Sequence, residues 1–243
     1  MQISTLSFSF PLHPGDTRAF RAAIVEQIGL GNSLFHGHDN SEPGVTKYTH
    51  QYPLIKFGVY RGRAFIMGMG AGAQAILRQL IPALPDQLLI AGRPCDTSDF
   101  KLTNRQWEPE VLSEYRTFGL YQWVALNKDN YESWKEHEGR PAARRLILDR
   151  CLTGQLRNLA KQTELAEKRE QIVARILRTD KVKRIQWKSA KFIAFNVVAE
   201  SNFNPPAGLG LGRCHSFGFG EVCSERRYQL LTVKKSKQAV TNT

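Results

Sequence analysis

Cysteine is scarce in this 243-residue chain and follows no spacing that indicates a function. The four cysteines are Cys95, Cys151, Cys214 and Cys223, and none of them forms a C-x-x-C pair. Short-spaced cysteine pairs are typical of zinc sites and redox motifs, and a dense set in a short secreted chain indicates a disulfide framework. The sequence therefore predicts reduced thiols, with no metal and no cofactor.

Long apolar runs are absent as well. A membrane-spanning helix needs roughly 20 consecutive apolar residues, and no segment approaches that length. The N-terminus, from Met1 to Thr5, lacks the basic region, apolar run and small-residue cleavage site of a secretory leader. No lipidation motif supports attachment to an acidic membrane surface. We expect a cytoplasmic protein with no membrane partner.

Acidic residues are too few to balance the basic ones. The chain has 34 Lys and Arg against 22 Asp and Glu, a net charge of +12. Residues 140–191 alone contain 15 basic against 5 acidic residues, a net charge of +10. Such a concentrated positive field attracts polyanions, of which nucleic acid is the usual one.

The first half of the chain shows the periodicity of a βαββαβ unit. Residues 2–10 alternate as a strand, and Phe20, Ala23, Ile24 and Ile28 form one face of a helix. Residues 52–59 and 64–69 read as a hairpin, residues 76–84 as a second helix and residues 87–91 as a last strand. This order is ferredoxin-like and predicts a first domain over residues 1–95.

The second half repeats the order more irregularly. After a polar linker at 96–109, we expect a second domain over 110–233, with a strand at 118–126 and a basic helix from Pro141. Strands are predicted at 171–178, 183–187, 191–198 and 217–223, and a disordered tail at 234–243. The predicted fold class is α+β, with two tandem ferredoxin-like domains.

Two histidines at 36 and 38 form the strongest candidate for catalysis. In extended backbone, His36 and His38 project to the same side. With a pKa near 6.5, one ring can be neutral and the other protonated near neutral pH, as general acid–base cleavage of RNA requires. Lys47, Tyr48 and Lys56 follow closely and are candidates for stabilising the developing phosphorane charge. A metal pair and a purely structural role are the alternatives.

Two glycine-rich segments are candidate phosphate sites. Residues 68–73 match G-x-G-x-x-A, but the expected acidic residue after the next strand is missing, so a tight strand-to-helix turn is the better interpretation. The second segment, residues 208–220, has five glycines in thirteen residues, and its backbone N–H groups can cradle an anion. Its predicted RNA contacts are Gly208, Gly210, Gly212, Arg213, His215 and Ser216. A flexible turn is the alternative.

Basic residues interleaved with aromatics complete the predicted RNA surface. Strand alternation is expected to place Lys181, Lys183, Arg184 and Lys188 on one face, beside Trp187, which can stack on a base or pack in the core. Arg144 and Arg145 extend this surface from the basic helix. Phosphate contacts of this kind supply affinity that depends strongly on salt.

Taken together, these segments resemble the CRISPR repeat-processing endoribonucleases of the RAMP superfamily. The glycine-rich loop at 208–220 is similar to that superfamily's signature loop, and the paired-histidine segment followed by Tyr52-Pro53-Leu54-Ile55 resembles one branch of it. The resemblance implies metal-independent cleavage of repeat RNA by 2′-OH attack, which leaves a 2′,3′-cyclic phosphate and a 5′-OH. It implies acid and base roles for His36 and His38, in an order left open.

The same superfamily includes members that bind RNA without cutting it. The alternative function is therefore a non-cleaving RNA-binding subunit of a CRISPR effector complex. The sequence leaves open whether the protein works alone, as a homodimer or with other effector subunits.

Overall fold

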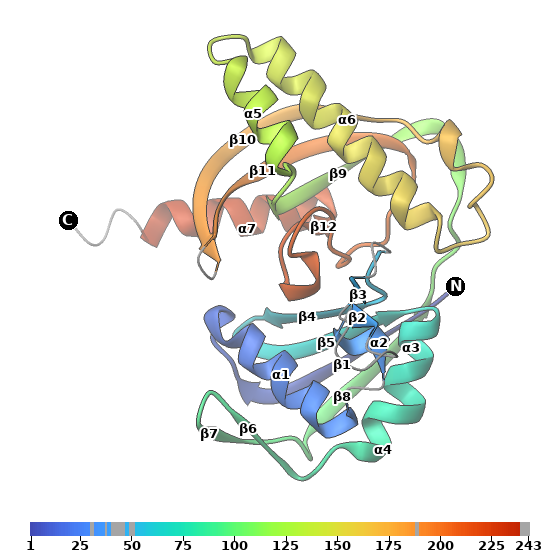
Figure 1. Ribbon diagram of the computed structural model, residues 1–243, viewed down its shortest axis with the longest axis vertical. Helices are drawn as coiled ribbons and strands as arrows, with labels where there is room; N and C mark the ends of the chain where they lie inside the picture. The colour runs from blue at the N-terminus through green and yellow to red at the C-terminus, as the bar shows by residue number, and fades with distance from the viewer. Residues whose placement is uncertain (30–31, 37, 40–46, 49–51, 188–189, 239–243) are drawn as a thin grey trace. The chain divides into compact units, whose positions relative to one another are not determined.

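The computed structural model describes residues 1–29, 32–36, 38–39, 47–48, 52–187 and 190–238 (Figure 1). Contacts divide the chain into two compact units. The first comprises residues 1–108 with 216–218, and the second comprises residues 109–215 with 219–243. Each unit has its own four-stranded antiparallel sheet.

The first unit has the ferredoxin-like strand order. Its sheet runs β4-β5-β1-β8, built from Ile55–Tyr60, Arg63–Met69, Gln2–Pro11 and Phe100–Gln106. If these strands are numbered along the chain, β1 and β5 are central, β4 and β8 are the edges, and the order is 2-3-1-4 as in a βαββαβ fold. The helices are α1 at Thr17–Ile28 and a second helix made of α3 (Ala71–Ala75), a π-helical turn (Ile76–Leu80) and α4 (Ile81–Ala83).

Aromatic packing holds the helices of the first unit on its sheet. Phe20 of α1 is fully buried and meets Phe8 of β1 edge-on, with ring centroids 5.7 Å apart. The same ring lies 5.8 Å from Phe57 of β4, again edge-on. Each buried aromatic side chain removes a large apolar surface from water, so the alternation in β1 and the 3.6-residue period of α1 converge on one core.

The last strand of the first sheet is a correction to the sequence prediction. Residues 87–91 do not join the main sheet, because β6 (Gln87–Ile90) pairs with β7 (Arg93–Asp96) in a separate hairpin. The fourth strand is β8, inside the segment predicted as the 96–109 linker, and it pairs with β1. In β8 Leu102 packs against the buried core and Phe100 meets the ring of Phe8 edge-on, while the other residues are polar and exposed, so this edge strand has a linker-like composition.

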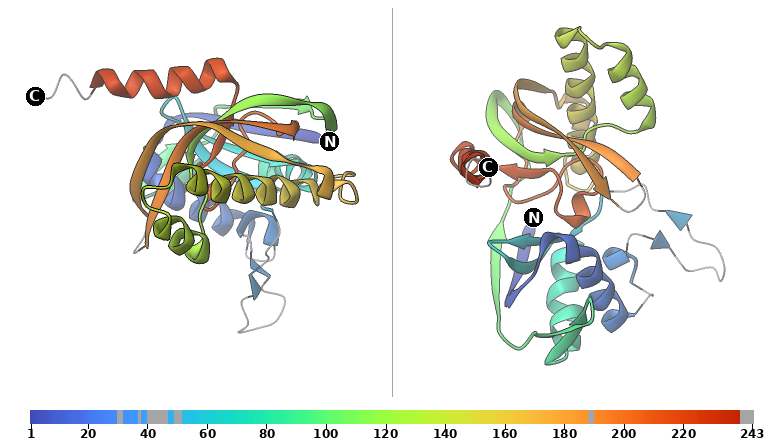
Figure 2. Two further views of the ribbon diagram at one scale, coloured as in Figure 1. Left: turned by 90° about the horizontal axis from the view of Figure 1, so that it is seen from above. Right: turned by 90° about the vertical axis from the view of Figure 1, so that its left-hand side faces the viewer.

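The second unit also has a 2-3-1-4 sheet, in the order β10-β11-β9-β12. Its elements are β9 (Val111–Trp123), α5 (Lys128–Glu136), α6 (Pro141–Ala160), β10 (Ala174–Trp187), β11 (Ala190–Phe203), β12 (Glu221–Cys223) and α7 (Glu225–Gln238). Helices α6 and α7 cover opposite faces of this sheet (Figure 2). The structure therefore confirms the α+β class with two tandem ferredoxin-like units.

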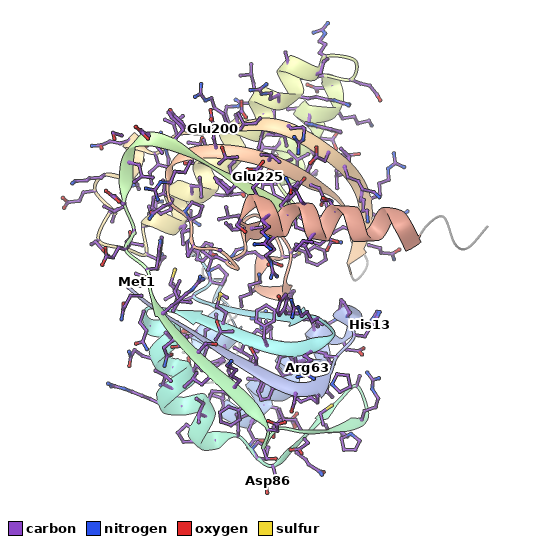
Figure 3. The ribbon with its side chains drawn as sticks, turned by 180° about the vertical axis from the view of Figure 1, so that it is seen from behind. Met1, His13, Arg63, Asp86, Glu200 and Glu225 are labelled. Carbon is purple, nitrogen blue, oxygen red and sulfur yellow. The ribbon has the colours of Figure 1, made fainter. Side chains whose placement is uncertain are left out.

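Two further predictions for the second unit are wrong. The strands expected at 171–178 and 183–187 are one strand, β10, because register shifts within it accommodate the polar residues between them. Of the tail expected to be disordered over 234–243, residues 234–238 are helical as the end of α7, and residues 239–243 lie outside the described residues. Tyr228 anchors that helix, since its ring is 1% exposed and its hydroxyl donates to Asp180 at 2.8 Å. Figure 3 shows the chain from the side of α7, with Glu225 at the start of that helix and Glu200 on β11.

Candidate nucleic-acid interface

A glycine-rich loop with one 3₁₀ turn (His215–Phe217) joins β11 to β12, where a ferredoxin-like fold would have its second helix. The loop is tied to the sheet through its backbone. The Gly208 N–H donates to the Val222 carbonyl at 2.7 Å, and the Leu211 N–H donates to the Gly220 carbonyl at 2.9 Å. Leu209 and Leu211 are buried. The loop is therefore fixed to the edge of the sheet by hydrogen bonds and buried side chains, and it is not a flexible turn.

Glycine is required in this loop because the backbone passes very close to its neighbours. Gly212 has φ +86°, and a Cβ there would lie 2.5 Å from the Val124 carbonyl oxygen. A Cβ on Gly210 would lie 2.7 Å from that of His215. The N–H groups of Gly208, Leu211 and Arg213 already donate to carbonyl groups of the chain, so these donors do not form an open cradle for an anion.

Arg213 is the side chain that this loop presents to solvent. Its guanidinium lies over the ring of Phe192, 5.1 Å from the centroid, which is a cation–π arrangement. His215 and Ser216, also predicted to contact RNA, are only half-exposed. The Nδ1 atom of His215 is hydrogen-bonded to the Gly212 carbonyl, so this ring helps to shape the loop.

Arg213 borders a pocket of about 500 Å³ within the second unit. Three further cations line it, namely Lys128, Arg184 and Lys191. The other lining residues are the aromatic Tyr131 and Phe192, the amide Asn127 and the apolar Leu126 and Ile193. None of the described residues that line the pocket is acidic. Four positive charges around one cavity make it an anion-binding site in electrostatic terms. We call it the basic–aromatic pocket.

The register of the β10–β11 hairpin places the two basic residues that it contributes to this pocket on one face. Arg184 lies opposite Ile193, and Gln186 lies opposite Lys191, so Arg184 and Lys191 share a face. Successive strand residues point to opposite faces, so Lys183 lies on the other side, as does Lys181. The expectation of a single basic face is therefore wrong. Lys188 lies outside the described residues, as does the side chain of Trp187.

The predicted arginines of α6 differ in their surroundings. The guanidinium of Arg144 stacks over Trp134, 3.8 Å from the ring centroid, and its Nε donates to the Trp134 carbonyl at 2.9 Å. This residue joins α6 to α5. Arg145 is exposed on the next helical position. The structure thus assigns a packing role to Arg144 and leaves Arg145 at the surface.

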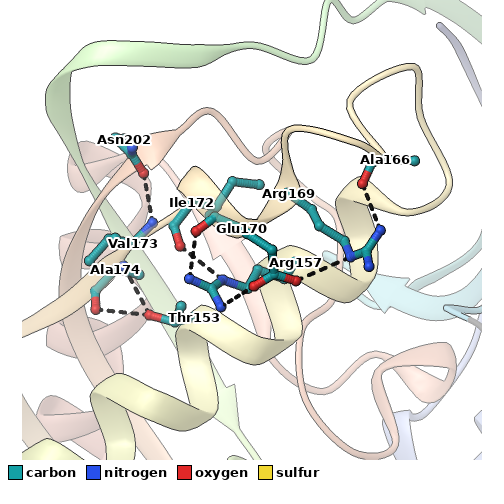
Figure 4. A network of polar contacts seen from close by, with 9 residues as sticks. All are labelled: Thr153, Arg157, Ala166, Arg169, Glu170, Ile172, Val173, Ala174 and Asn202. Carbon is teal, nitrogen blue, oxygen red and sulfur yellow. Dashed lines mark hydrogen bonds and ion pairs between the residues drawn. The ribbon is translucent and has the colours of Figure 1, made fainter.

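Arg157 of α6 has a similar structural role. Its Nε donates to the Ile172 carbonyl at 3.1 Å, and its other nitrogens bond the carboxylate and carbonyl of Glu170 at 2.6 and 2.7 Å (Figure 4). The side chain therefore holds the segment between α6 and β10 on the helix. Part of the positive charge of residues 140–191 is therefore used in folding contacts, since a hydrogen bond between an arginine and a carboxylate is a strong one.

Four of the five predicted catalytic residues lie within residues 36–48 of the first unit. His36 ends α2 (Ser33–His36), and His38 lies in β2 (His38–Asp39), directly opposite Tyr48 of β3 (Lys47–Tyr48). Asp39 lies opposite Lys47. The side chains of His36, His38, Lys47 and Tyr48 lie outside the part of the chain that the structure describes. The backbone pairing does bring His38 and Tyr48 to one position of a hairpin.

Lys56 is the predicted catalytic residue whose side chain is described. It lies in β4, is 4% exposed, and has its Nζ 5.7 Å from the centroid of the Phe65 ring. A buried lysine of this kind has long apolar contacts along its side chain. By strand alternation, Lys56 lies on the sheet face opposite to that of the core residues Ile55 and Phe57.

The other glycine-rich segment is a packing device. A Cβ on Gly72, at the start of the second helix, would lie 2.9 Å from the Leu54 carbonyl carbon. This close approach agrees with the tight strand-to-helix turn predicted from the sequence. No group of three or more metal-ligating side chains occurs among the described residues. Within the same residues, no helix is both long and apolar enough to span a membrane.

Sequence reasoning missed the α5 side of the pocket. Lys128 and Tyr131 lie on α5, a helix that was not predicted. Its start is marked by Asn127, whose Oδ1 accepts a hydrogen bond from the Asn130 N–H at 2.8 Å. Asparagine is a preferred N-cap residue, so this signal was present in the sequence. The cavity itself depends on long-range pairing and had no local signal.

Comparison with known proteins gives a consistent family assignment. The Cas6b N-terminal domain model matches residues 1–107, and the Cas6b C-terminal domain model matches residues 110–225. The matches are consecutive and together take in most of the chain. They separate at the same place as the two compact units.

Solved structures agree with the fold. A crystal structure of Cas6b is 20% identical, with a TM-score of 0.75 over 92% of this chain and 100% of that chain. A second, of the CRISPR RNA processing endoribonuclease Cas6b, is 19% identical, with a TM-score of 0.65 over 92% and 99%. An uncharacterised protein of Methanocaldococcus jannaschii is 33% identical over 100 residues, which are 41% of this chain and 65% of that protein.

Proposed function

Because the chain belongs to the Cas6b family, we propose that it is an endoribonuclease that cleaves repeat RNA in CRISPR precursor transcripts. The observation that carries this proposal is the match of the two Cas6b domain models to residues 1–107 and 110–225. The basic–aromatic pocket supports RNA as the substrate, because its four cations suit a phosphate backbone.

The proposed reaction uses the substrate's own hydroxyl as nucleophile. A neutral imidazole removes the proton of a ribose 2′-OH, whose oxygen attacks the adjacent phosphorus. The P–O5′ bond breaks, and a protonated imidazole donates its proton to the leaving 5′ oxygen. The products are a 2′,3′-cyclic phosphate and a 5′-OH. We assign the two imidazoles to His36 and His38 without an order between them. Lys47, Tyr48 and Lys56 are secondary candidates for stabilising the phosphorane charge.

Cleavage of repeat RNA in excess chelator is the experiment that tests this proposal. The wild-type protein should cut the RNA without metal and leave cyclic-phosphate ends. His38→Ala and His36→Ala should each slow cleavage by roughly 10²- to 10⁴-fold, the usual contribution of a general acid or base. His13→Ala is the matched control, since His13 is an exposed histidine of the same unit. Equal rates for all three variants and the wild type would refute the histidine assignment.

A non-cleaving RNA-binding subunit is the second candidate function. The basic–aromatic pocket favours it, since four cations can hold RNA whether or not the histidines act. Tight binding of repeat RNA with no cleavage, in chelator or in Mg²⁺, would support this function. Cleavage that appears only with Mg²⁺ would indicate a metal-dependent nuclease. Association with other effector subunits, homodimer formation and a cytoplasmic location stay predictions.

A further inference from the structure

The basic–aromatic pocket combines an apolar floor with a cationic rim. Leu126 and Ile193 are the aliphatic side chains that line it, here called its floor, and Leu126 is 6% exposed. Arg184, Lys191 and Arg213 supply positive charge from two different segments of the chain. A surface that attracted phosphates alone would need only the cations. The floor and the rings require a ligand that also has a flat, weakly hydrated part.

The two rings of the pocket have different roles. The Phe192 ring is already covered by the Arg213 guanidinium, 5.1 Å from its centroid. This contact restricts the guanidinium and prepares it for an anion. Tyr131 is 36% exposed and lines the same cavity from the first turns of α5. Tyr131 is therefore the ring that the pocket offers for stacking.

Asn127 adds a directed polar group. Its Oδ1 accepts the Asn130 N–H at 2.8 Å, which fixes the orientation of the amide. The NH₂ group is then the part that Asn127 presents to a ligand. A donor of this kind suits a ring nitrogen or carbonyl oxygen on a base edge. The volume of the basic–aromatic pocket, about 500 Å³, lies within the range of small-ligand pockets.

We propose that the basic–aromatic pocket binds one unpaired nucleotide of the substrate RNA. The base stacks on Tyr131 above the apolar floor, and Arg184, Lys191 and Arg213 hold its flanking phosphates. A base within a duplex stem stays stacked and paired, so only a single-stranded or extruded nucleotide can enter. This inference rests on the proposed function, which supplies RNA as the ligand.

An abasic scan of the repeat RNA tests the inference. The RNA carries 2′-O-methyl groups, which remove the attacking hydroxyl, so the RNA is not cleaved during the measurement. One nucleotide at a time is replaced by an abasic residue, and affinity is measured by fluorescence anisotropy for the wild type and for Tyr131→Ala. Base–aromatic stacking predicts one position where loss of the base weakens wild-type binding roughly tenfold. The same RNA should bind Tyr131→Ala no worse than the unmodified RNA does.

Tyr115→Ala is the matched control, because Tyr115 is an exposed tyrosine of the same unit with Arg175 over its ring, outside the pocket. With Tyr115→Ala, the affinity should depend on the position of the abasic residue as it does with the wild type. The same is expected for Tyr131→Phe. Circular dichroism checks that each variant folds. If no position depends on Tyr131, or if Tyr115→Ala removes the same dependence, the inference is overturned. Cleavage of unmodified RNA is measured separately, so failure of the nuclease proposal leaves this result distinct.

Discussion

Gly212 illustrates how one residue type can support two explanations that only a structure separates. Its positive φ of +86° is unfavourable for any side chain, and its Cβ position lies 2.5 Å from a carbonyl oxygen. The glycine-rich loop therefore has its composition because it passes close to β9. Its one exposed cation, Arg213, then faces the pocket.

Replacement of Gly212 should damage folding before it affects RNA contacts. We expect Gly212→Val to destabilise the protein by about 3 kcal/mol, from the left-handed backbone and the clash with Val124. At this chain length, the melting temperature should fall by roughly 10 °C. Thermal unfolding followed by circular dichroism measures the change.

Gly154 provides the matched control for this substitution. It lies on the exposed side of α6 with nothing within 4 Å of its Cβ position. Gly154→Ala should leave stability unchanged or raise it by about 0.5–1 kcal/mol. A Gly212→Val protein with the wild-type melting temperature and weaker RNA binding would instead make this glycine a direct RNA contact.

Arg144 and Arg145 show the limit of reading single charges from a sequence. Both are basic residues that are adjacent in the sequence, and the helical periodicity alone gives no reason to assign them different roles. In the structure, Arg144 stacks on Trp134 and Arg145 is exposed. A charge becomes a binding residue only where packing leaves it accessible.

At the scale of the element, the β10–β11 hairpin divides its basic residues between two faces. Arg184 and Lys191 line the pocket, whereas Lys181 and Lys183 lie on the opposite strand face and do not line it. Arg184→Gln with Lys191→Gln should therefore weaken RNA binding and lower the salt dependence. Each phosphate contact with single-stranded nucleic acid contributes about 0.7 to the slope of log affinity against log salt, so the double variant should lose about 1.4.

Lys181→Gln with Lys183→Gln is the charge-matched control, since it removes two positive charges from the same strand. Binding of labelled repeat RNA at several salt concentrations measures the slope for each protein. The control variant should lose much less of this slope than the Arg184→Gln, Lys191→Gln variant does. Equal losses from the two double variants would mean that the hairpin attracts RNA through its total charge, with no preference for the pocket face.

Prediction from sequence succeeded for elements with strong periodicity and failed where burial was partial. The β4–β5 hairpin and α1 were predicted because Phe20, Phe57 and their neighbours repeat at strand and helix spacing. Strand β8 was missed because Phe100 and Leu102 are its only apolar residues and the other five are polar and exposed. The pocket was missed because it forms between α5, the hairpin and the glycine loop, and its residues on α5 are more than 50 residues before Arg184 in the sequence.

At the scale of the whole chain, charge is unequal between the two units. Residues 109–243 contain 24 Lys and Arg against 14 Asp and Glu, whereas residues 1–108 contain ten against eight. The candidate catalytic histidines lie in the nearly neutral first part. The second unit thus has the charge needed to attract RNA, and the first has the residue types needed for acid–base chemistry.

This division predicts how affinity and specificity respond to salt. If the four pocket cations each contact a phosphate, the slope for single-stranded RNA is about −3, and affinity falls roughly fiftyfold between 50 and 200 mM salt. Phosphate contacts carry little sequence information, whereas base contacts do. A scrambled RNA of equal length should therefore have a similar slope but weaker binding at every salt concentration. Anisotropy titrations of both RNAs with the full chain measure this. A flat response, or a preference for the repeat that vanishes at high salt, would contradict a pocket that reads a base as well as phosphates.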